Sequence, residues 1–509
     1  MNIKKTYITT PIFYVNDLPH IGHAYTSIIC DTVARFNKLD GKEILFTTGT
    51  DEHGMKVEKA AKEKGEIPQD FVDKVSQNFK NLSQTLGIIN TDFIRTTEKR
   101  HKNSAIYFWN ELLKNNQIYK SKYSGWYSVK DESYYQDKEL IKTGDVYTTK
   151  DGSQVDWIEE ESFFFKLSEW QEKLLNFYEE NPEFVMPKSR MNEVKSFVKG
   201  GLKDLSISRT SFDWGIKVPE SNHIMYVWID ALTNYLTSIG YPNITDEKME
   251  YWENCIHIIG KDILRFHAIY WPAMLMAINH TLPKTIFAHG WWTNEGKKIS
   301  KSLGNTIDPN QMIEKFGLDQ LRYFLLREVP LGNDGDFSES SLINRINSDL
   351  SNNLGNLIQR VVKFINKNFN NSVPNSLREE ADQIKLICQG YEMIITVKKK
   401  MKEFQISKCL EDIFFYIDEL NKYMDESQPW NSFKIDPKKA GKDLSILIEC
   451  FRVIGIVLQP FIPNASKKIL DILNINNESR GFNNLNSKNI LMSNHVLNKP
   501  SPIFPRYEK

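Results

Sequence analysis

The sequence predicts an α/β fold that carries a β-rich insertion and is followed by a C-terminal bundle of α-helices. Strand and helix patterns alternate over residues 1–115, which is typical of a parallel sheet with crossover helices. From about residue 120 to 218, Tyr, Ser, Asp and Gly become frequent and the helical periodicity fades. Between about 340 and 473, nearly every segment has the pattern of an amphipathic helix, which indicates a separate bundle.

The elements of the sheet can be placed in order along the chain. An apolar run predicts a first strand at 7–14, a helix is expected over 24–36, and a second buried strand over 43–48. The same pattern resumes after the insertion, with further strands predicted at 224–228, 256–260 and 285–290. Residues 50–54 follow the second strand, where open α/β sheets bind ligands.

Composition narrows the class of protein. Lys and Arg together number 65, as do Asp and Glu, so no global basic field indicates nucleic acid, although local clusters can still bind it. Five scattered cysteines without a Cys-x-x-Cys pair are typical of reduced thiols in a cytosolic protein. The most apolar stretch, 446–462, contains charged residues and is expected to be a core helix rather than a membrane span. No targeting segment is apparent, so we expect a cytoplasmic protein, with an organellar source that has lost its leader left open.

A histidine motif, His20-Ile21-Gly22-His23, lies between the first predicted strand and the first helix. Backbone N–H groups at a helix N-terminus can bind phosphate, and Gly22 lets a ligand approach the backbone closely. His20 and His23 can both donate hydrogen bonds to phosphate oxygens. A lone histidine is more often a packing residue, but the preceding proline and the following helix favour a phosphate site here.

A lysine motif, Lys298-Ile299-Ser300-Lys301-Ser302, lies well downstream on a stretch flanked by Gly296 and Asn305. It supplies two ammonium groups on a loop that is suited to closing over a polyphosphate.

In this order in one chain, the two motifs resemble the paired signatures of class I aminoacyl-tRNA synthetases. Five further segments are similar to the methionyl-tRNA synthetase family, namely residues 9–16, 49–54, 204–209, 226–232 and 260–267. The resemblance covers nearly the whole chain. It implies a Rossmann-like catalytic domain that activates L-methionine with ATP and Mg²⁺ to methionyl-adenylate. It also implies transfer of methionine to the 3′ end of tRNA(Met), including the initiator tRNA.

Adenylate formation needs charge neutralisation on phosphate oxygens but no side-chain nucleophile. The resemblance assigns His20 and His23 to the α-phosphate, and Lys298 and Lys301 to the departing pyrophosphate. The implied ATP-binding set contains these four residues together with Gly22 and Ser300.

The resemblance also implies a methionine pocket. Asp51 would hold the substrate ammonium, aromatic walls would surround the thioether, and Tyr14 and His267 would place polar hydrogens near the sulfur. Any one of these residues alone would be interpreted as ordinary core. Carried over by position, the pocket comprises Ile12, Tyr14, Asp51, Trp228, Ala231, Leu232, Tyr235, Ile263, His267 and Trp271.

In the helical region, four residues match the anticodon readers of the family: Asn356, Arg360, Pro429 and Trp430. Asn356 and Arg360 share one helix face, and Pro429 and Trp430 are expected in a break between helices. Amide and guanidinium groups can hydrogen-bond to splayed bases while an indole stacks on one.

The chain departs from the family at the zinc knuckles that many relatives carry in the insertion. Residues 127–132 read Tyr-Ser-Val-Lys-Asp-Glu, and no cysteine lies between Cys30 and Cys255. Because zinc prefers thiolate or imidazole ligands, we expect a zinc-free knuckle and no resident metal. The chain ends at Lys509 without the appended domain that some relatives use to dimerise, so we expect a monomer.

Three alternatives are weighed against this interpretation. Other class I synthetases carry a larger editing insertion or zinc-binding cysteines, and a nucleotidylyltransferase would not explain the helical bundle. A non-catalytic RNA-binding paralogue should have lost a motif histidine or lysine, and all four are present. The expected domains are a catalytic first half (1–115), a connective insertion (116–222), a catalytic second half (223–290), a lysine-loop and stem-contact region (291–345) and an anticodon-binding domain (346–509).

Overall fold

The computed structural model describes residues 4–15, 18–128, 133–135, 137–144, 146–294, 296–299 and 305–508. The chain forms two compact units, both of them discontinuous in sequence. The first, here called the sheet unit, contains Lys5–Pro19 and Ile44–Ala288. The second, here called the bundle unit, contains Met1–Lys4, His20–Glu43 and His289–Lys509.

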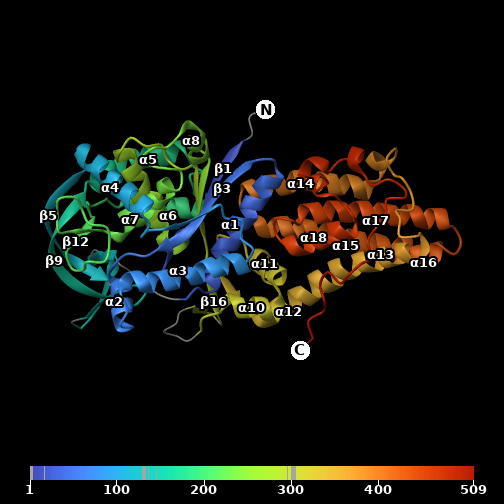
Figure 1. The fold of residues 1–509 in the computed structure, drawn as a ribbon, viewed down its shortest axis with the longest axis horizontal. Coiled ribbons are helices and arrows are strands. Elements are labelled where there is room, and N and C mark those ends of the chain that lie inside the picture. The colour runs from blue at the N-terminus through green and yellow to red at the C-terminus, as the bar shows by residue number, and fades with distance from the viewer. Residues whose placement is uncertain are drawn as a thin grey trace. The chain divides into compact units, whose positions relative to one another are not determined.

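The sheet unit contains a seven-stranded sheet with the order β10-β15-β14-β1-β3-β2 and β4 paired to β3, of which Figure 1 labels β1 and β3. The ladders of β1 with β14, β10 with β15, β2 with β3 and β3 with β4 are parallel, which confirms the predicted α/β class. The strands are β1 (Lys5–Thr9), β2 (Phe13–Tyr14), β3 (Glu43–Asp51), β4 (Asp92–Arg95), β10 (Val185–Met186), β14 (Cys255–Gly260) and β15 (Thr285–His289).

Two predicted strands differ from the structure. The run at 7–14 divides into β1 and β2, because Pro11 between them has no N–H group to donate to a ladder. The strand expected at 224–228 is β13 (Ile224–Met225), which pairs antiparallel with β12 (Ser208–Arg209). Helix α7 (Val227–Thr237) begins directly after it, so Trp228 lies on a helix.

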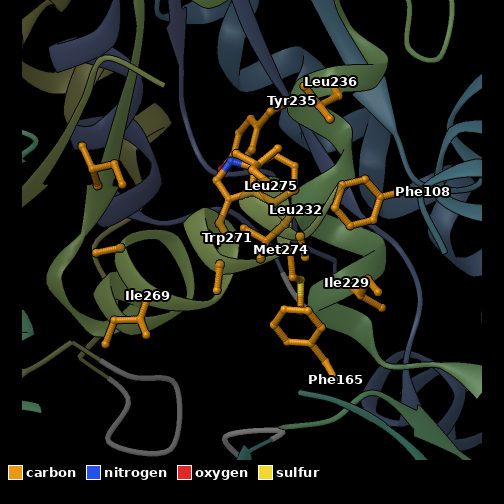
Figure 2. Close-up of a cluster of buried hydrophobic side chains, with 14 of the residues drawn as sticks. Phe108, Phe165, Ile229, Leu232, Tyr235, Leu236, Ile269, Trp271, Met274 and Leu275 are labelled. Atoms are coloured by element: carbon orange, nitrogen blue, oxygen red, sulfur yellow. The ribbon is translucent and has the colours of Figure 1, made fainter. Parts of the chain in front are cut away.

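Helices supply the large side chains of the sheet unit's core. Trp109, Trp252 and Trp271 are fully buried there. Figure 2 shows Leu232 and Tyr235 together with Trp271 in one part of this apolar cluster. The helices include α2 (Met55–Glu63), α3 (Pro68–Thr85), α4 (Lys99–Lys114), α7, α8 (Asp246–Trp252) and α9 (Trp271–Ala277).

The insertion begins as the predicted β-rich region. Its strands are β5 (Ile118–Ser128), β6 (Ser133–Tyr135), β7 (Leu140–Thr143), β8 (Val146–Thr149), β9 (Gln154–Phe165) and β11 (Leu205–Ser206). Its second half differs from the expectation, because it contains two amphipathic helices, α5 (Gln171–Glu180) and α6 (Lys188–Lys199). On the β-rich half, Trp126 stacks on Tyr147 at 4.1 Å and meets Trp157 edge-on at 5.2 Å, so aromatic packing joins β5, β8 and β9.

The bundle unit confirms the predicted helical region. Helices α13 (Asn356–Asn368), α14 (Lys385–Lys402), α15 (Ile406–Ser427) and α17 (Pro437–Val457) lie lengthwise beside one another (Figure 1). The unit also contains α1 (Ile21–Leu39), α10 (Pro309–Phe316), α11 (Leu318–Arg327), α12 (Glu339–Arg345), the π-helix η6 (Ile346–Gly355), α16 (Pro429–Ser432) and α18 (Pro463–Ile472). A small sheet has the order β17 (Lys297–Lys298), β16 (Trp292–Asn294), β18 (Gly335–Phe337).

A buried arginine on α11 ties α1 to the turn between α17 and α18. Arg322 is fully buried and pairs with Asp31 of α1 at 2.7 Å. It also donates to the carbonyl oxygens of Phe461 (2.9 Å) and Pro460 (3.0 Å). One turn earlier on α11, Asp319 accepts from the backbone N–H of Ala465 at the start of α18. The helix that carries the histidine motif is therefore anchored to the bundle.

Candidate active site

The histidine motif forms the first turn of α1. His20 is the N-cap residue, and its Nδ1 accepts from the backbone N–H of Gly22 at 3.1 Å. The Nδ1 of His23 accepts from the backbone N–H of His20 at 3.0 Å, and the two rings lie 4.0 Å apart. His20 therefore takes the place that Ser or Asp commonly occupies at a helix N-cap, and His23 takes that of the Glu or Gln three residues later.

These bonds determine the protonation pattern of both rings. A nitrogen that accepts a hydrogen bond carries no hydrogen, so each neutral ring carries its hydrogen on Nε2. Burial, and next the neighbouring His20, hold the pKa of His23 well below its ordinary value, which keeps that ring neutral at pH 7. Each ring thus carries its N–H group on Nε2, the nitrogen that the helix cap does not use.

The structure gives Gly22 a role that the sequence did not indicate. A Cβ at this position would lie 2.9 Å from Cε1 and 3.1 Å from Nδ1 of His20. Any side chain would therefore displace the ring that caps the helix, in addition to obstructing a ligand.

The lysine motif is described only in part. Lys298 ends β17, where it is paired with Thr293 of β16. Ser300, Lys301 and Ser302 lie outside the described residues. On the other side of the motif, Ile307 accepts from the backbone N–H of Ile21 at 3.0 Å. The segment that follows the lysine motif is therefore bonded to the first turn of α1.

The predicted methionine residues all belong to the sheet unit and come from three places in its fold. Tyr14 on β2 and Asp51 at the end of β3 are register partners in neighbouring parallel strands, and Ile12 precedes β2. Trp228, Ala231, Leu232 and Tyr235 lie on α7. The third group, Ile263, His267 and Trp271, follows β14 through the π-helix η4 (Phe266–Tyr270) to the start of α9. Figure 2 shows Trp271 beside Tyr235 and Leu232.

A hydrogen-bonded pair lies inside this set. The carbonyl of Ile263 can only accept, so the 3.0 Å contact places the hydrogen of His267 on Nδ1. Its Nε2 then accepts from the Tyr235 hydroxyl at 2.7 Å. Burial lowers the pKa of His267 to about 4, against the opposing bond to Ile263 and the charge of Asp262, so the ring is neutral. The expectation that His267 offers a polar hydrogen to sulfur is therefore wrong, because its one hydrogen is donated to Ile263.

Sequence reasoning missed several residues of this region. Phe266 stacks on Trp228 with ring centroids 3.7 Å apart and planes within 7°. His257 of β14 packs on Tyr235 at 4.1 Å, and its Nδ1 is 2.8 Å from the Thr9 hydroxyl. Arg209 lies over the Tyr226 ring at 4.4 Å. Arg209 and Phe266 fall within segments that carry the family resemblance, which was the only available signal, and His257 had none.

The segment around Asp51 is held by its neighbours. Asp51 is 7% exposed. The next residue, Glu52, is fully buried and accepts from Arg95 at 2.6 and 3.0 Å and from the Thr50 hydroxyl at 2.7 Å. The Trp214 indole donates to the backbone carbonyl of Glu52 at 2.6 Å.

The predicted anticodon residues lie in the bundle unit. Asn356 begins α13, and Arg360 on the same helix lies over the Trp430 ring at 5.1 Å. Pro429 and Trp430 begin the short helix α16. The predicted break between helices therefore occurs at Gln428, whose backbone is in the left-handed conformation. The structure thus brings Arg360 and Trp430 together, and both have exposed surface for a partner.

The part of the chain that the structure describes offers neither a metal-ligand cluster nor a helix suited to cross a membrane. There, no group of three or more His, Cys, Asp or Glu side chains could hold a metal ion. Residues 129–132 of the predicted zinc-free knuckle lie outside the described residues. Among the described helices, none combines the length and the apolarity that a membrane crossing requires.

Comparison with protein families gives two matches that follow each other along the chain. Residues 6–362 match the family described as tRNA synthetases class I (M). Residues 373–508 match the anticodon binding domain of methionyl tRNA ligase.

Relatives and solved structures match over nearly the full length. The chain is 52% identical to a methionine–tRNA ligase of Rickettsia bellii over 507 residues, 99% of each chain. It is 48% identical to that of Brucella suis over 510 residues, covering 100% of this chain and 99% of the relative. Mycobacterium tuberculosis methionyl-tRNA synthetase in complex with methionyl-adenylate superposes with a TM-score of 0.95 at 42% identity, covering 99% and 100% of the two chains.

Proposed function

This chain belongs to the methionine–tRNA ligases of the class I tRNA synthetase family, and we propose that it activates methionine with ATP and transfers it to tRNA. The substrates are L-methionine, ATP with its Mg²⁺, and tRNA(Met), including the initiator tRNA. The products are methionyl-tRNA, AMP and pyrophosphate.

One feature of the sheet unit favours methionine as the amino-acid substrate. In the sheet unit, Tyr235 and Trp228 from the predicted set lie against a neutral His267, and Trp271 packs on Tyr235. A thioether favours such polarisable, uncharged surroundings, because aromatic rings attract sulfur and no charge must be desolvated. In this proposal, Asp51 binds the ammonium group by a charge-assisted hydrogen bond. Ile12, Tyr14, Ala231, Leu232 and Ile263 complete the pocket.

The chemical step is assigned to the phosphate motifs. The methionine carboxylate attacks the α-phosphorus of ATP, and the bond to the pyrophosphate oxygen breaks. His20 and His23 donate from Nε2 to the α-phosphate oxygens, which gain charge in the transition state. Lys298, Lys301 and Ser300 bind the departing pyrophosphate. Gly22 leaves room for the capping ring of His20, which holds that ring in place for the α-phosphate.

The bundle unit is assigned to the tRNA. Trp430 stacks on an anticodon base, and Asn356 and Arg360 hydrogen-bond to base edges, with Pro429 fixing the start of α16. The monomeric state, the cytoplasmic location and the absence of zinc stay predictions from the sequence.

Amino-acid-dependent ATP–pyrophosphate exchange, run with each of the twenty amino acids, tests the proposal. We expect exchange with methionine and at most traces with the others. Exchange driven by another amino acid would replace methionine as the substrate. No exchange with any amino acid, from folded protein supplied with Mg²⁺, would overturn the enzymatic function.

A further inference from the structure

A buried carboxylate in the sheet unit is shared by two histidines. Asp230, His53 and His101 are each no more than 2% exposed. The Nδ1 of His53 is 2.6 Å from Oδ2 of Asp230, and the Nε2 of His101 is 2.7 Å from Oδ1. On its far side, the Nδ1 of His101 lies 3.2 Å from the hydroxyl of Thr237.

The carboxylate is charged and therefore acts only as an acceptor. Burial alone would raise the pKa of Asp230, but the charge of His53 and the hydrogen bonds from both histidines hold this pKa lower, at about 2. Both ring nitrogens that face the ionised carboxylate must then carry hydrogens. The direction of the His53 ring is set by this bond, because hydrogen bonds to a buried anion are strong and directional.

The hydrogen bond between His53 and Asp230 joins two segments that carry proposed methionine-binding residues. His53 follows Asp51 by two residues, just past the end of β3. Asp230 lies on α7 between Trp228 and Ala231. The bond therefore joins the strand end that carries the ammonium ligand directly to the helix that carries four of the proposed pocket residues. The intervening residue, Glu52, is fixed separately by Arg95 and Trp214.

We propose that Asp230 is a positioning residue. Through His53 it sets the distance between Asp51 and the aromatic side chains of α7, and this distance sets the length of side chain that the pocket accepts. This inference rests on the proposed function, since it takes Asp51 and α7 as the two ends of the methionine site. The ligand class concerned is α-amino acids with a linear, unbranched side chain. Asp230 and His53 contact neither substrate in this scheme.

The ratio of kcat/KM for two substrates of different side-chain length distinguishes a positioning role of Asp230 from a role in stability alone. ATP–pyrophosphate exchange is measured with L-methionine and with L-ethionine, which is one methylene longer. A well-defined apolar pocket discriminates between such a pair by roughly 10–200-fold in kcat/KM. His53→Leu keeps an apolar contact with Trp214 but cannot donate to Asp230. We expect this variant to lower the methionine-to-ethionine ratio at least about fivefold, with the KM for ATP changed less than about twofold.

Asp230→Asn is the second variant, since it keeps the shape while offering one acceptor oxygen in place of two. It should shift the ratio in the same direction, and it carries the test if His53→Leu does not fold. Thr237→Val is the matched control, because it removes a hydroxyl from the same buried cluster without touching His53. It should keep the wild-type ratio even if its melting temperature falls.

The outcomes separate the two proposals. If the wild type does not exchange with methionine, the proposed function fails. If the wild type does so and the folded variants keep its ratio, or if Thr237→Val shifts the ratio equally, Asp230 has a structural role only and this inference is overturned.

Discussion

The methionine residues proposed in the sheet unit and the histidine motif of the bundle unit differ in the partners that hold their side chains. In the proposed methionine pocket of the sheet unit, Tyr235 donates to His267, His267 donates to the carbonyl of Ile263, and all three residues are largely buried. In the histidine motif of the bundle unit, His20 and His23 are partly buried, and the Nδ1 of each ring accepts from a backbone N–H group of the motif itself.

This difference predicts different kinetic consequences. A pocket whose groups are fixed before substrate arrives selects by fit, so changes there should appear in affinity and discrimination. Donors that act on charge developing in the transition state contribute to the rate of the chemical step. Four predictions test or sharpen this contrast, together with the length-discrimination test above.

The largest effect is expected at the phosphate motifs. Lys301→Ala should slow adenylate formation by on the order of a hundredfold or more, because one ammonium no longer stabilises the pyrophosphate as it leaves. Methionine binding should be nearly unchanged. Pre-steady-state adenylate formation and equilibrium binding of methionine measure the two quantities separately.

Lys297→Ala, a neighbouring lysine outside the motif, is the matched control and should retain near-wild-type exchange. A wild-type rate in Lys301→Ala would remove this lysine from the mechanism, and a comparable loss in methionine affinity would remove the contrast between the two parts.

The second effect concerns pH and stability. His267 has a pKa of about 4 when folded, below the value of about 6.5 for an unfolded histidine, so the unfolded chain binds more protons between these pH values. Its contribution to stability is therefore fully present above about pH 6.5 and is lost as the pH falls toward 4. The free energy of unfolding should lose up to roughly 3 kcal/mol from this residue.

Urea denaturation of the wild type and of His267→Gln across pH 4–7 measures that contribution. It is the difference between the two proteins in how steeply the free energy of unfolding falls as the pH is lowered. If both proteins lose the same stability over this range, His267 is not the buried neutral ring described above.

A third, smaller effect is expected in the bundle unit. Trp430→Ala should forfeit roughly 1–3 kcal/mol of tRNA recognition, since a stacked base loses its platform. The loss should appear in the kcat/KM of aminoacylation for tRNA and be absent from ATP–pyrophosphate exchange.

Replacing the anticodon of the tRNA should also cost the Trp430→Ala variant less than the wild type, because part of the readout is already gone. The melting temperature of the variant serves as the control for bundle stability. An equal penalty from the anticodon swap in both proteins would identify Trp430 as a packing residue.

The smallest effect is expected from a treatment that would remove zinc. Purified protein should contain no stoichiometric zinc, and chelation followed by readdition of Mg²⁺ should leave exchange unchanged. Omitting Mg²⁺ should abolish exchange, because the ion bridges ATP phosphates. One mole of zinc per chain by elemental analysis would show that the prediction from the missing cysteines is wrong.

Local patterns were sufficient to predict much of the fold. The alternation of strands and helices, the helix after His20 and the C-terminal bundle follow from periodicity and capping positions, and the structure confirms them. The sequence predicts a strand at Trp228 because the apolar run before it has no periodicity of its own, whereas in the structure a two-residue pairing with β12 ends that strand early. Helices α5 and α6 were missed because their polar faces resemble the surrounding loops in composition.

The buried polar groups could not be predicted in the same way. Asp230 meets His101 and His53 across 129 and 177 residues of sequence, and no spacing rule joins residues so far apart. The π-helix at 266–270 does not follow the 3.6-residue period of an α-helix. The stacking of Phe266 on Trp228 therefore has no periodic signal in the sequence. The roles proposed for the individual site residues therefore follow from the family resemblance.

The anchoring of α1 by Arg322 has a consequence for synthesis of the chain. Thr32 and Arg322, which meet in this junction, are 290 residues apart in sequence. At about 5–20 residues per second, the ribosome needs roughly 15–60 s to reach Arg322 after it has made α1. Throughout that interval the helix that begins with the histidine motif lacks its arginine partner. Nascent chains stopped before residue 322 should therefore expose α1 to proteases and chaperones, while longer chains protect it.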